Sequence, residues 1–408
     1  MNNTIKLAVA AALVAAASTA NAGISIPAGD WTLDIGGVVN AYYTSTRASG
    51  TVAGGGLGGA AAGATSTTNN ITTGLLPNYL SVSGKTRQND LDVAFTISIQ
   101  PGAATANAGT LGSLNQRQAF LTFGDASWGS IKLGKDLGIY ASDAILNDMT
   151  LLGVGSNAAS VGNTTLGRIG TGYMYADWKS QVAYSTPNFN GFNATVGVTQ
   201  SWNALSSNVT DATYTSVGNF LAAAVPASSG SALRGGSSPA FEGKVAYAWT
   251  GDVAGKVWAS ALSQKVQGLS TSNAWDLGAT VTVAGLGLTG YYGEGRGTGT
   301  TVQFLDAFDT TGAKRDSQDW YVQATYVLPT TTKLGLSYGE SKLDATANDR
   351  ANGKQDYTKD MWTVGAYHPL TKHLNLVAEY SDVSNTALVT AKGETTAKTI
   401  SLGAILFF

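Results

Sequence analysis

Side chains that usually perform covalent chemistry are scarce in this chain. Its 408 residues include no cysteine and two histidines, His368 and His373. The lack of cysteine excludes thiol catalysis and thiolate zinc sites, and it means that an exported form folds without disulfides. The two histidines are poorly placed to act as the base that a nucleophilic serine would need. We therefore predict no enzyme activity, no metal site and no cofactor.

The remaining candidate chemistry is electrostatic, and charge is sparse. Charged residues make up 12% of the chain, which is about half of the ~25% usual in a soluble domain. Without residues 1–22, which carry Lys6 and no acidic residue, 23 basic and 26 acidic residues remain, a net charge of −3. Proteins that bind nucleic acid usually present a clustered basic face. The charge balance therefore argues against a nucleic-acid partner.

Residues 1–22 have the pattern of a signal peptide for export. Lys6 supplies a positive start, residues 7–17 are apolar, and Ala20-Asn21-Ala22 is a small-residue cleavage site before Gly23. The apolar run is shorter than the roughly 20 residues that a membrane-spanning helix needs, and no later segment qualifies. We therefore predict export of a protein that begins at Gly23 and forms one unit over residues 23–408.

The last eleven residues, 398–408 (KTISLGAILFF), show how that unit is built. Every second residue from Ile400 to Phe408 is apolar, with Thr399, Ser401 and Gly403 placed around and between them. A period of two directs those apolar side chains to one face of a β-strand. A soluble protein that ended on such a strand would expose an adhesive edge, whereas a membrane barrel closes its last strand against its first.

The same alternation recurs along the whole exported chain. It predicts sixteen strands, at about 31–43, 77–85, 90–100, 115–124, 129–135, 175–186, 192–202, 241–249, 254–266, 274–284, 286–296, 320–328, 332–342, 358–368, 373–383 and 398–408. Short turns alternate with long polar loops, and aromatic residues gather near strand ends. These features favour an all-β, antiparallel transmembrane barrel with short periplasmic turns and long extracellular loops. A soluble β-protein is the alternative, but it has no reason to lengthen every second connection.

One connection differs from the other loops. The alternation is lost between about residues 136 and 171, and residues 140–152 are unusually apolar for a surface loop. Such a segment should be covered, and lying against the inner wall of a barrel would cover it. Lys179 lies nearby on the polar face of the next strand, opposite in parity to Trp178 and Val182.

Three stretches of the chain resemble the general porins of Gram-negative bacteria. Residues 115–125 (NQRQAFLTFGD) with 129–135 (GSIKLGK) look like the arginine-bearing fourth strand and the fifth strand of that family. Residues 181–192 (QVAYSTPNFNGF) look like the sixth strand, turn and seventh strand, and the chain ends on an aromatic residue. The resemblance implies a water-filled channel of the outer membrane for passive diffusion of small hydrophilic solutes and ions. It also implies a homotrimer in contact with lipid and lipopolysaccharide, with Phe408 as the signal for the outer-membrane assembly machinery.

The resemblance also implies a pore constriction. In the family, the loop after the fifth strand folds inward and opposes a row of basic wall residues. Here it would carry Asp143 and Asp148, and the basic residues would be Arg117, Lys179 and Arg168. The chain departs from the family where residues 79–81 (YLS) replace an arginine, so strong ion selectivity and the solute cannot be assigned.

Two other functions remain open at this point. A membrane barrel can carry an enzyme on its rim, but the poor placement of the two histidines as a catalytic base disfavours this interpretation. A surface protein or adhesin could instead use the long loops expected at 44–74 and 203–239. Loop deletion without loss of conductance would separate a surface role from a channel role.

Overall fold

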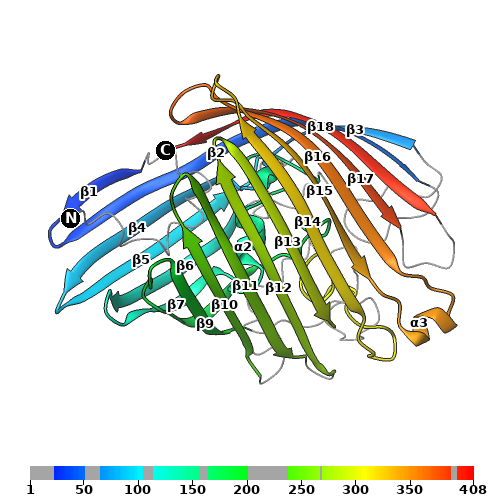
Figure 1. Ribbon diagram of the computed structural model, residues 1–408, viewed down its shortest axis with the longest axis horizontal. Coiled ribbons are helices and arrows are strands. Elements are labelled where there is room, and N and C mark those ends of the chain that lie inside the picture. Colours follow the sequence, from blue (N-terminus) through cyan, green and yellow to red (C-terminus); the bar gives the residue numbers. More distant parts are fainter. Residues whose placement is uncertain are drawn as a thin grey trace.

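A computed structural model describes residues 23–50, 65–103, 114–156, 164–200, 238–266, 269–386 and 393–408. These residues form one closed sheet that curves into a barrel (Figure 1). The expected signal peptide, residues 1–22, lies outside the described residues, as does almost all of the loop expected at 203–239.

Strands account for most of the described chain. They are β1 (Ile24–Ala28), β2 (Trp31–Gly50), β3 (Thr65–Thr72), β4 (Tyr79–Gln88), β5 (Leu91–Pro101), β6 (Leu114–Asp125), β7 (Gly129–Leu137), β8 (Trp178–Ser185), β9 (Phe192–Thr199), β10 (Ala240–Trp249), β11 (Val253–Lys265), β12 (Thr271–Val283), β13 (Leu286–Arg296), β14 (Asp316–Val327), β15 (Lys333–Leu343), β16 (Tyr357–Pro369), β17 (Leu374–Thr386) and β18 (Glu394–Phe407). The described helices are short: α2 (Ser142–Leu146), the 3₁₀ helix η3 (Met149–Leu152) and α3 (Ala347–Ala351). Among the described residues, no helix is long and apolar enough to cross a membrane.

The barrel closes where β18 pairs with β2. This antiparallel ladder runs from Thr395 opposite Gly50 to Phe407 opposite Val38. On its other edge β2 pairs with β4 along its first part and with β3 along its second, so β3 and β4 share one position in the ring. Strands β2 and β4–β18 therefore make the sixteen-stranded antiparallel barrel that the sequence predicts. The short β1 pairs antiparallel with the first residues of β2, next to the point where the pairing of β18 with β2 ends.

The long loop expected at 44–74 is partly wrong. Residues 44–50 continue β2, and residues 65–72 form β3, which pairs with that extension. Both segments are rich in threonine and serine, so they lack an apolar face and read as loop by composition. Threonine is nonetheless a good strand former, and a backbone ladder can continue where both faces are polar.

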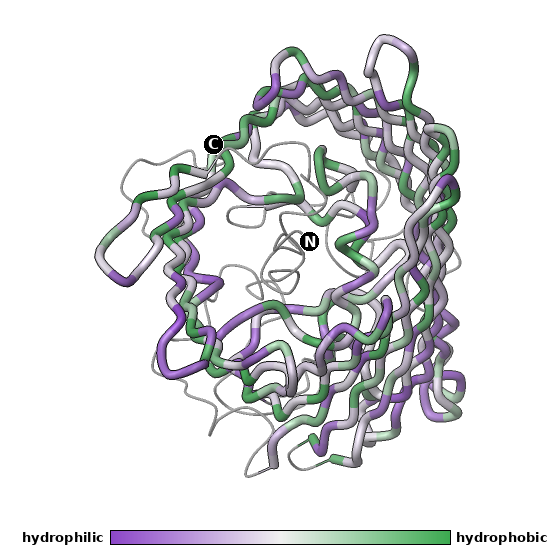
Figure 2. Tube along the Cα trace, turned by 60° about the vertical axis from the view of Figure 1, so that its left-hand side comes forward, coloured by the Kyte–Doolittle hydropathy of each residue, from purple (hydrophilic) through white to green (hydrophobic). Residues whose placement is uncertain are grey.

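Alternate residues of each strand separate into two faces. Outward residues such as Leu336, Ile400 and Leu402 are large, apolar and more than half exposed. Inward residues such as Thr363 and Ser401 are polar and buried. Figure 2 shows the ring of strands surrounding an interior into which other parts of the chain fold. An apolar exterior with a polar interior is the arrangement of a barrel that sits in lipid.

Tight turns join strands at one end of the barrel. Asn89-Asp90 and Ala284-Gly285 each have two consecutive positive φ angles, 47° and 63° in the first pair and 47° and 82° in the second. This is the geometry of a two-residue hairpin whose twist matches that of its strands. Together with the longer connections at the opposite end, such turns fix a short-turn end and a long-loop end.

Candidate functional site

The connection between β7 and β8 folds into the barrel. We call residues 138–177 the inner loop; residues 138–156 and 164–177 of it are described. It contains α2 and η3, and its residues Ala141, Ala144 and Val154 have no exposed surface. The described parts of the loop expected at about 136–171 therefore lie inside the barrel.

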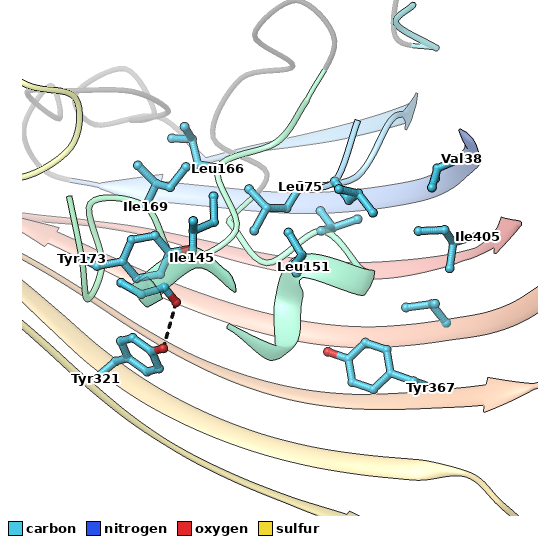
Figure 3. Packing of buried hydrophobic residues seen from close by; sticks show 14 of the residues in the cluster. Val38, Leu75, Ile145, Leu151, Leu166, Ile169, Tyr173, Tyr321, Tyr367 and Ile405 are labelled. Atoms are coloured by element: carbon cyan, nitrogen blue, oxygen red, sulfur yellow. Dashed lines mark hydrogen bonds between the residues drawn. The ribbon is translucent and has the colours of Figure 1, made fainter. Parts of the chain in front are cut away.

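Apolar contacts hold the inner loop against the wall. Ile145 and Leu151 of the loop belong to one buried cluster with Val38 of β2, Tyr367 of β16 and Ile405 of β18 (Figure 3). Burying a large apolar side chain contributes about 1.5–3 kcal/mol. The apolar composition of residues 140–152 is therefore explained by contact with the inner wall.

The base of the loop is anchored on Glu242 of β10. One carboxylate oxygen of Glu242 accepts hydrogen bonds from the backbone N–H groups of Ile139 and Tyr140, at 2.8 and 2.9 Å. The other oxygen forms an ion pair with Lys179 and accepts from Thr199. Both partners of the ion pair have fully buried side chains. Losing either partner would leave an uncompensated buried charge. The pair therefore holds the start of the inner loop against β10.

Asp143 forms a charged contact at the start of α2. Its carboxylate pairs with Lys244 of β10 at 3.1 Å and with Lys256 of β11. Burial in itself raises the pKa of the Asp143 carboxyl, but the two lysines more than offset this effect and hold the pKa below its ordinary value. Asp143 is therefore ionised at neutral pH, and it bridges the loop to two neighbouring strands.

Asp148 and Arg168 connect the two halves of the inner loop. Asp148 caps η3 by accepting from the backbone N–H of Thr150 at 2.9 Å, and it accepts from the Tyr173 hydroxyl at 2.8 Å. The backbone N–H of Arg168 donates to the same carboxylate at 3.3 Å. The Arg168 guanidinium, which is fully buried, donates to the carbonyl of Met361 on β16 at 2.8 Å. Asp148 and Arg168 thus connect the first and second described parts of the inner loop to each other, and Arg168 connects them to β16.

The far end of the loop is held by Glu379 of β17. Its carboxylate accepts from the backbone N–H groups of Val154 and Gly155 at 2.7 and 2.9 Å, and from the Tyr367 hydroxyl at 2.6 Å. Beyond this point Leu75, which precedes β4, donates its N–H to the Gly153 carbonyl at 2.8 Å. The inner loop therefore follows the wall from β10 to the segment before β4.

A second connection, residues 297–315 between β13 and β14, supports the base of the inner loop. Gln303 accepts a hydrogen bond from Lys179 at 2.7 Å, and the Thr301 carbonyl accepts from the N–H of Tyr175 at 2.8 Å. Arg315 at its end makes a buried two-point ion pair with Asp349 of α3, at 2.7 and 2.8 Å. Residues 297–315 therefore contact the base of the inner loop on one side and α3 on the other.

Comparison with known proteins establishes the family. A family model described as Gram-negative porin matches residues 8–388. The chain belongs to this family. It is an outer-membrane channel for passive diffusion of solutes, and it is not an enzyme. No curated protein sequence matches the chain.

Solved outer-membrane proteins share the fold at low sequence identity. The anion-selective porin from Comamonas acidovorans has a TM-score of 0.59 and 17% identity, covering 93% of this chain and 100% of that one. The outer-membrane channel DcaP of Acinetobacter baumannii has a TM-score of 0.56 and 14% identity, covering 92% and 98%. OmpT of Vibrio cholerae, in its trimer form, has a TM-score of 0.55 and 13% identity, covering 93% and 99%. At these identities the likeness concerns the fold alone.

The porin brings four of the five predicted charged residues to the inner loop or its contacts. Asp143, Asp148 and Arg168 lie within the loop, and Lys179 contacts its base through Glu242. Arg117 lies apart from them, in a β-bulge of β6, with its guanidinium carbon 5.8 Å from the centroid of the Trp178 ring. The inward position belongs to the neighbouring Gln118, which pairs in regular register with Ser98, alternates with the buried Phe120 and donates to Asp136 at 3.1 Å.

Sequence reasoning missed the partners on the wall of the porin. Glu242, Lys244, Lys256 and Glu379 each contact the inner loop directly. Glu242 and Lys244 alternate with the outward Phe241 and Val245, so their inward parity was readable. Their contacts with a loop about one hundred residues away in sequence were not, because no local pattern encodes them.

Proposed function

We propose that the inner loop forms the narrowest part of the channel, with a weak preference for anions. The proposal is carried by the unequal exposure of the paired charges. The side chains of Lys132, Lys244 and Lys256 are 17%, 21% and 32% exposed, whereas their partners Asp136 and Asp143 are 10% and 4% exposed. Three lysines and two aspartates give this group a net charge of +1. The lysine side chains are also more exposed to water than the aspartate side chains. Rings of charged side chains set ion preference in channels.

The other predicted constriction residues have a supporting role in this proposal. Lys179, Arg168 and Asp148 hold the inner loop at its base and its middle, and their buried charges are used in those contacts. They define the width of the passage, while the lysines near water act on the solute. Our proposal assigns no contact with the solute to Arg117.

Reversal potentials in a salt gradient test the proposal. Lys244→Gln and Lys256→Gln should each lower the chloride-to-potassium permeability ratio by about two- to fivefold, since one charge a few ångströms away is worth up to about 1 kcal/mol in water. Lys85→Gln is the matched control, because Lys85 pairs with Asp34 on other strands, at 3.2 Å. Equal reversal potentials for the wild type and the three variants, with normal conductance, would contradict the proposal that Lys244 and Lys256 set the ion preference of the constriction.

We also propose that three copies assemble in the outer membrane. The trimer form of the similar Vibrio cholerae OmpT and membership of the porin family support this state. A detergent-solubilised mass of three chains would agree with it, and a folded, conducting monomer would contradict it.

The remaining proposals concern export and assembly. We propose that residues 1–22 are removed as the export signal, that the outward face contacts lipopolysaccharide, and that Phe408 is read by the assembly machinery. Support for Phe408 comes from its position, since it ends the strand that closes the barrel and exchanges backbone hydrogen bonds with Gly37, at 2.8 and 3.1 Å.

A further inference from the structure

A shallow groove crosses the outward face of the wall from β7 to β12, which lie side by side (Figure 1). Its volume is about 760 Å³, within the range of roughly 300–1,000 Å³ that is usual for ligand pockets. Two neighbouring rows of outward residues line it. One row follows paired positions through Val198, Phe241, Ser263 and Asn273, and the other follows Val196, Gly243 and Ala261.

The middle of the groove is recessed because its floor carries small side chains. Gly243 of β10 lies opposite Ala261 of β11, and the larger Val196 and Phe241 stand beside them. A Cβ added to Gly243 would meet nothing closer than 3.6 Å, and the φ angle of Gly243 is not in the left-handed region. Neither packing nor backbone conformation therefore requires a glycine here. The missing side chain leaves space on the outer surface.

The groove is apolar along most of its length. Val182, Val198 and Phe241 are 57%, 41% and 59% exposed on the lipid-facing side. Glu242 is the one charged residue among the described lining residues, and its carboxylate contacts the inner loop on the other side of the wall. Lipid tails are as apolar as this groove, so the hydrophobic effect does not hold a chain in it. Close packing and contacts of the lipid head group must do so.

Two lysines lie where the groove reaches the long-loop end of the barrel. Lys265 is exposed on the outward face of β11, two residues beyond Ser263 of the groove. Lys314 donates to the carbonyl of Thr271, the residue opposite Lys265, at 3.0 Å. Within the part of the chain that the structure describes, neither lysine forms an ion pair. Their positive charges are therefore available to an anionic head group.

The other charges at this end do not cancel those of the two lysines. Arg296 lies opposite Asn273 and pairs with Asp316 at 3.0 Å, and Glu294 lies opposite Trp275. Three cations and two anions give this end of the groove a net charge of +1. Trp275 is 41% exposed on the same face, and tryptophan gathers at the depth of the lipid head groups. The positive end of the groove therefore lies at the depth of lipid phosphates.

We propose that the groove holds one acyl chain of the lipid A part of lipopolysaccharide, with a lipid A phosphate beside Lys265 and Lys314. The proposal rests on the proposed contact of the outward face with lipopolysaccharide, and it gives that contact a place. Long loops face the outside of the cell in such barrels, so the positive end lies in the outer leaflet. Five strand spacings make the groove about 24 Å long. One leaflet supplies about 15 Å of hydrocarbon, so a chain of that leaflet fits.

Titration of the refolded barrel with purified lipid A, followed by native mass spectrometry, tests the groove. Gly243→Leu should raise the lipid A concentration for half-maximal binding about three- to tenfold, because the added side chain takes the place of the acyl chain and close packing is lost. Gly290→Leu is the matched control. Gly290 lies on the outward face of β13, outside the groove, and an added Cβ there meets nothing within 4 Å. The heat-dependent shift in gel mobility confirms that each variant is folded.

A second pair of variants tests the head-group contact without changing the groove. Lys265→Gln should raise the half-maximal concentration about fivefold, the effect of one cation near an anionic lipid surface. Lys398→Gln should leave it unchanged, since Lys398 lies on β18 at the same end of the barrel and pairs with Asp382 at 3.6 Å. Lipid A from which both phosphates have been removed should bind equally to the wild type and to Lys265→Gln.

The outcomes separate the groove from the general contact with lipopolysaccharide. Equal binding of lipid A by the wild type and Gly243→Leu would overturn the groove and leave the general contact in place. A wild type that binds no lipid A would contradict both. Displacement of lipid A by an equal amount of phosphatidylglycerol would overturn lipid A as the occupant. Loss of the three-chain assembly in Gly243→Leu, with unchanged binding of lipid A, would show that the groove is an interface between copies of the chain and would also overturn the proposal.

Discussion

Charged residues inside this barrel are mostly used to hold the inner loop in position. Lys179 is buried against Glu242, and Arg168 donates to the Met361 carbonyl. Residue type and strand parity identify such groups as inward, but they do not reveal whether a charge faces solute or another part of the chain. The partners decide this, and for these two residues the partners belong to the protein.

The Asp143 carboxyl should contribute to how the channel responds to acid. Its pKa lies below the ordinary value of about 3.9, so its bridge to Lys244 and Lys256 contributes stability above that pH and loses it as pH falls through the lower folded pKa. At neutral pH, Asp143→Asn should show a stronger anion preference than the wild type. The difference between the two proteins should persist to about pH 4 and vanish as the pH falls through the lowered pKa of Asp143. A difference that vanishes already near pH 6 would contradict this assignment.

The inner loop behaves as one element because its ends and its middle are attached to different strands. Gly153 is where side-chain size matters most, since an added Cβ would lie 2.1 Å from a carboxylate oxygen of Glu379. The same carboxylate receives the N–H groups of Val154 and Gly155. A side chain at Gly153 would therefore displace the acceptor that holds the far end of the loop.

Gly153→Val should loosen that end by about 1–3 kcal/mol, the usual cost of overpacking. Faster hydrogen exchange at the amides of Val154 and Gly155, and larger fluctuations of the open current, would report the change. Gly290→Val is the matched control, because an added Cβ there meets nothing within 4 Å. Unchanged exchange in Gly153→Val would show that Glu379 is dispensable for holding the loop.

Most of the strands could be predicted from the sequence, for a physical reason. A wall between lipid and water imposes a period of two on every strand that crosses it, so even the short β7 was found. Residues 44–50 and 65–72 were missed because that constraint is absent where both faces are polar. Arg117 was assigned to the inner face although it has the same parity as the exposed Leu121, and the regular pairing of β5 with β6 as far as Gln118 keeps that parity. The wall contacts of Asp143 were unpredictable because they join segments about one hundred residues apart.

At the scale of the whole molecule, the barrel depends on its closing ladder. Phe408 is the last residue of the chain, and its N–H and carbonyl both bond to Gly37. Its ring also lies close to Gly37, 2.7 Å from where a Cβ would be. The C-terminal residue is therefore part of the wall.

Deletion of Phe408 should reduce the folded fraction through two separable effects. Loss of its backbone bonds removes about 1–3 kcal/mol, at about 0.5–1.5 kcal/mol for each bond. Refolding into detergent, followed by the heat-dependent shift in gel mobility, measures this effect alone. Assembly in cells additionally measures recognition, so a larger loss in cells than in detergent is expected. Phe408→Tyr keeps the ring and the backbone and should behave as the wild type. If the Phe408 deletion gave the wild-type folded yield both in detergent and in cells, both roles of Phe408 would be contradicted.

The closing ladder also constrains when the protein can fold. The hydroxyls of Thr46 and Thr399 meet at 2.9 Å although they lie 353 positions apart in sequence. Contacts of such separation form slowly, because the intervening chain must be ordered first. The edge of β2 that pairs with β18 therefore stays unpaired until β18 has been synthesised and exported. During that interval the chain carries an open, aggregation-prone strand, and its survival depends on how quickly the last strand arrives.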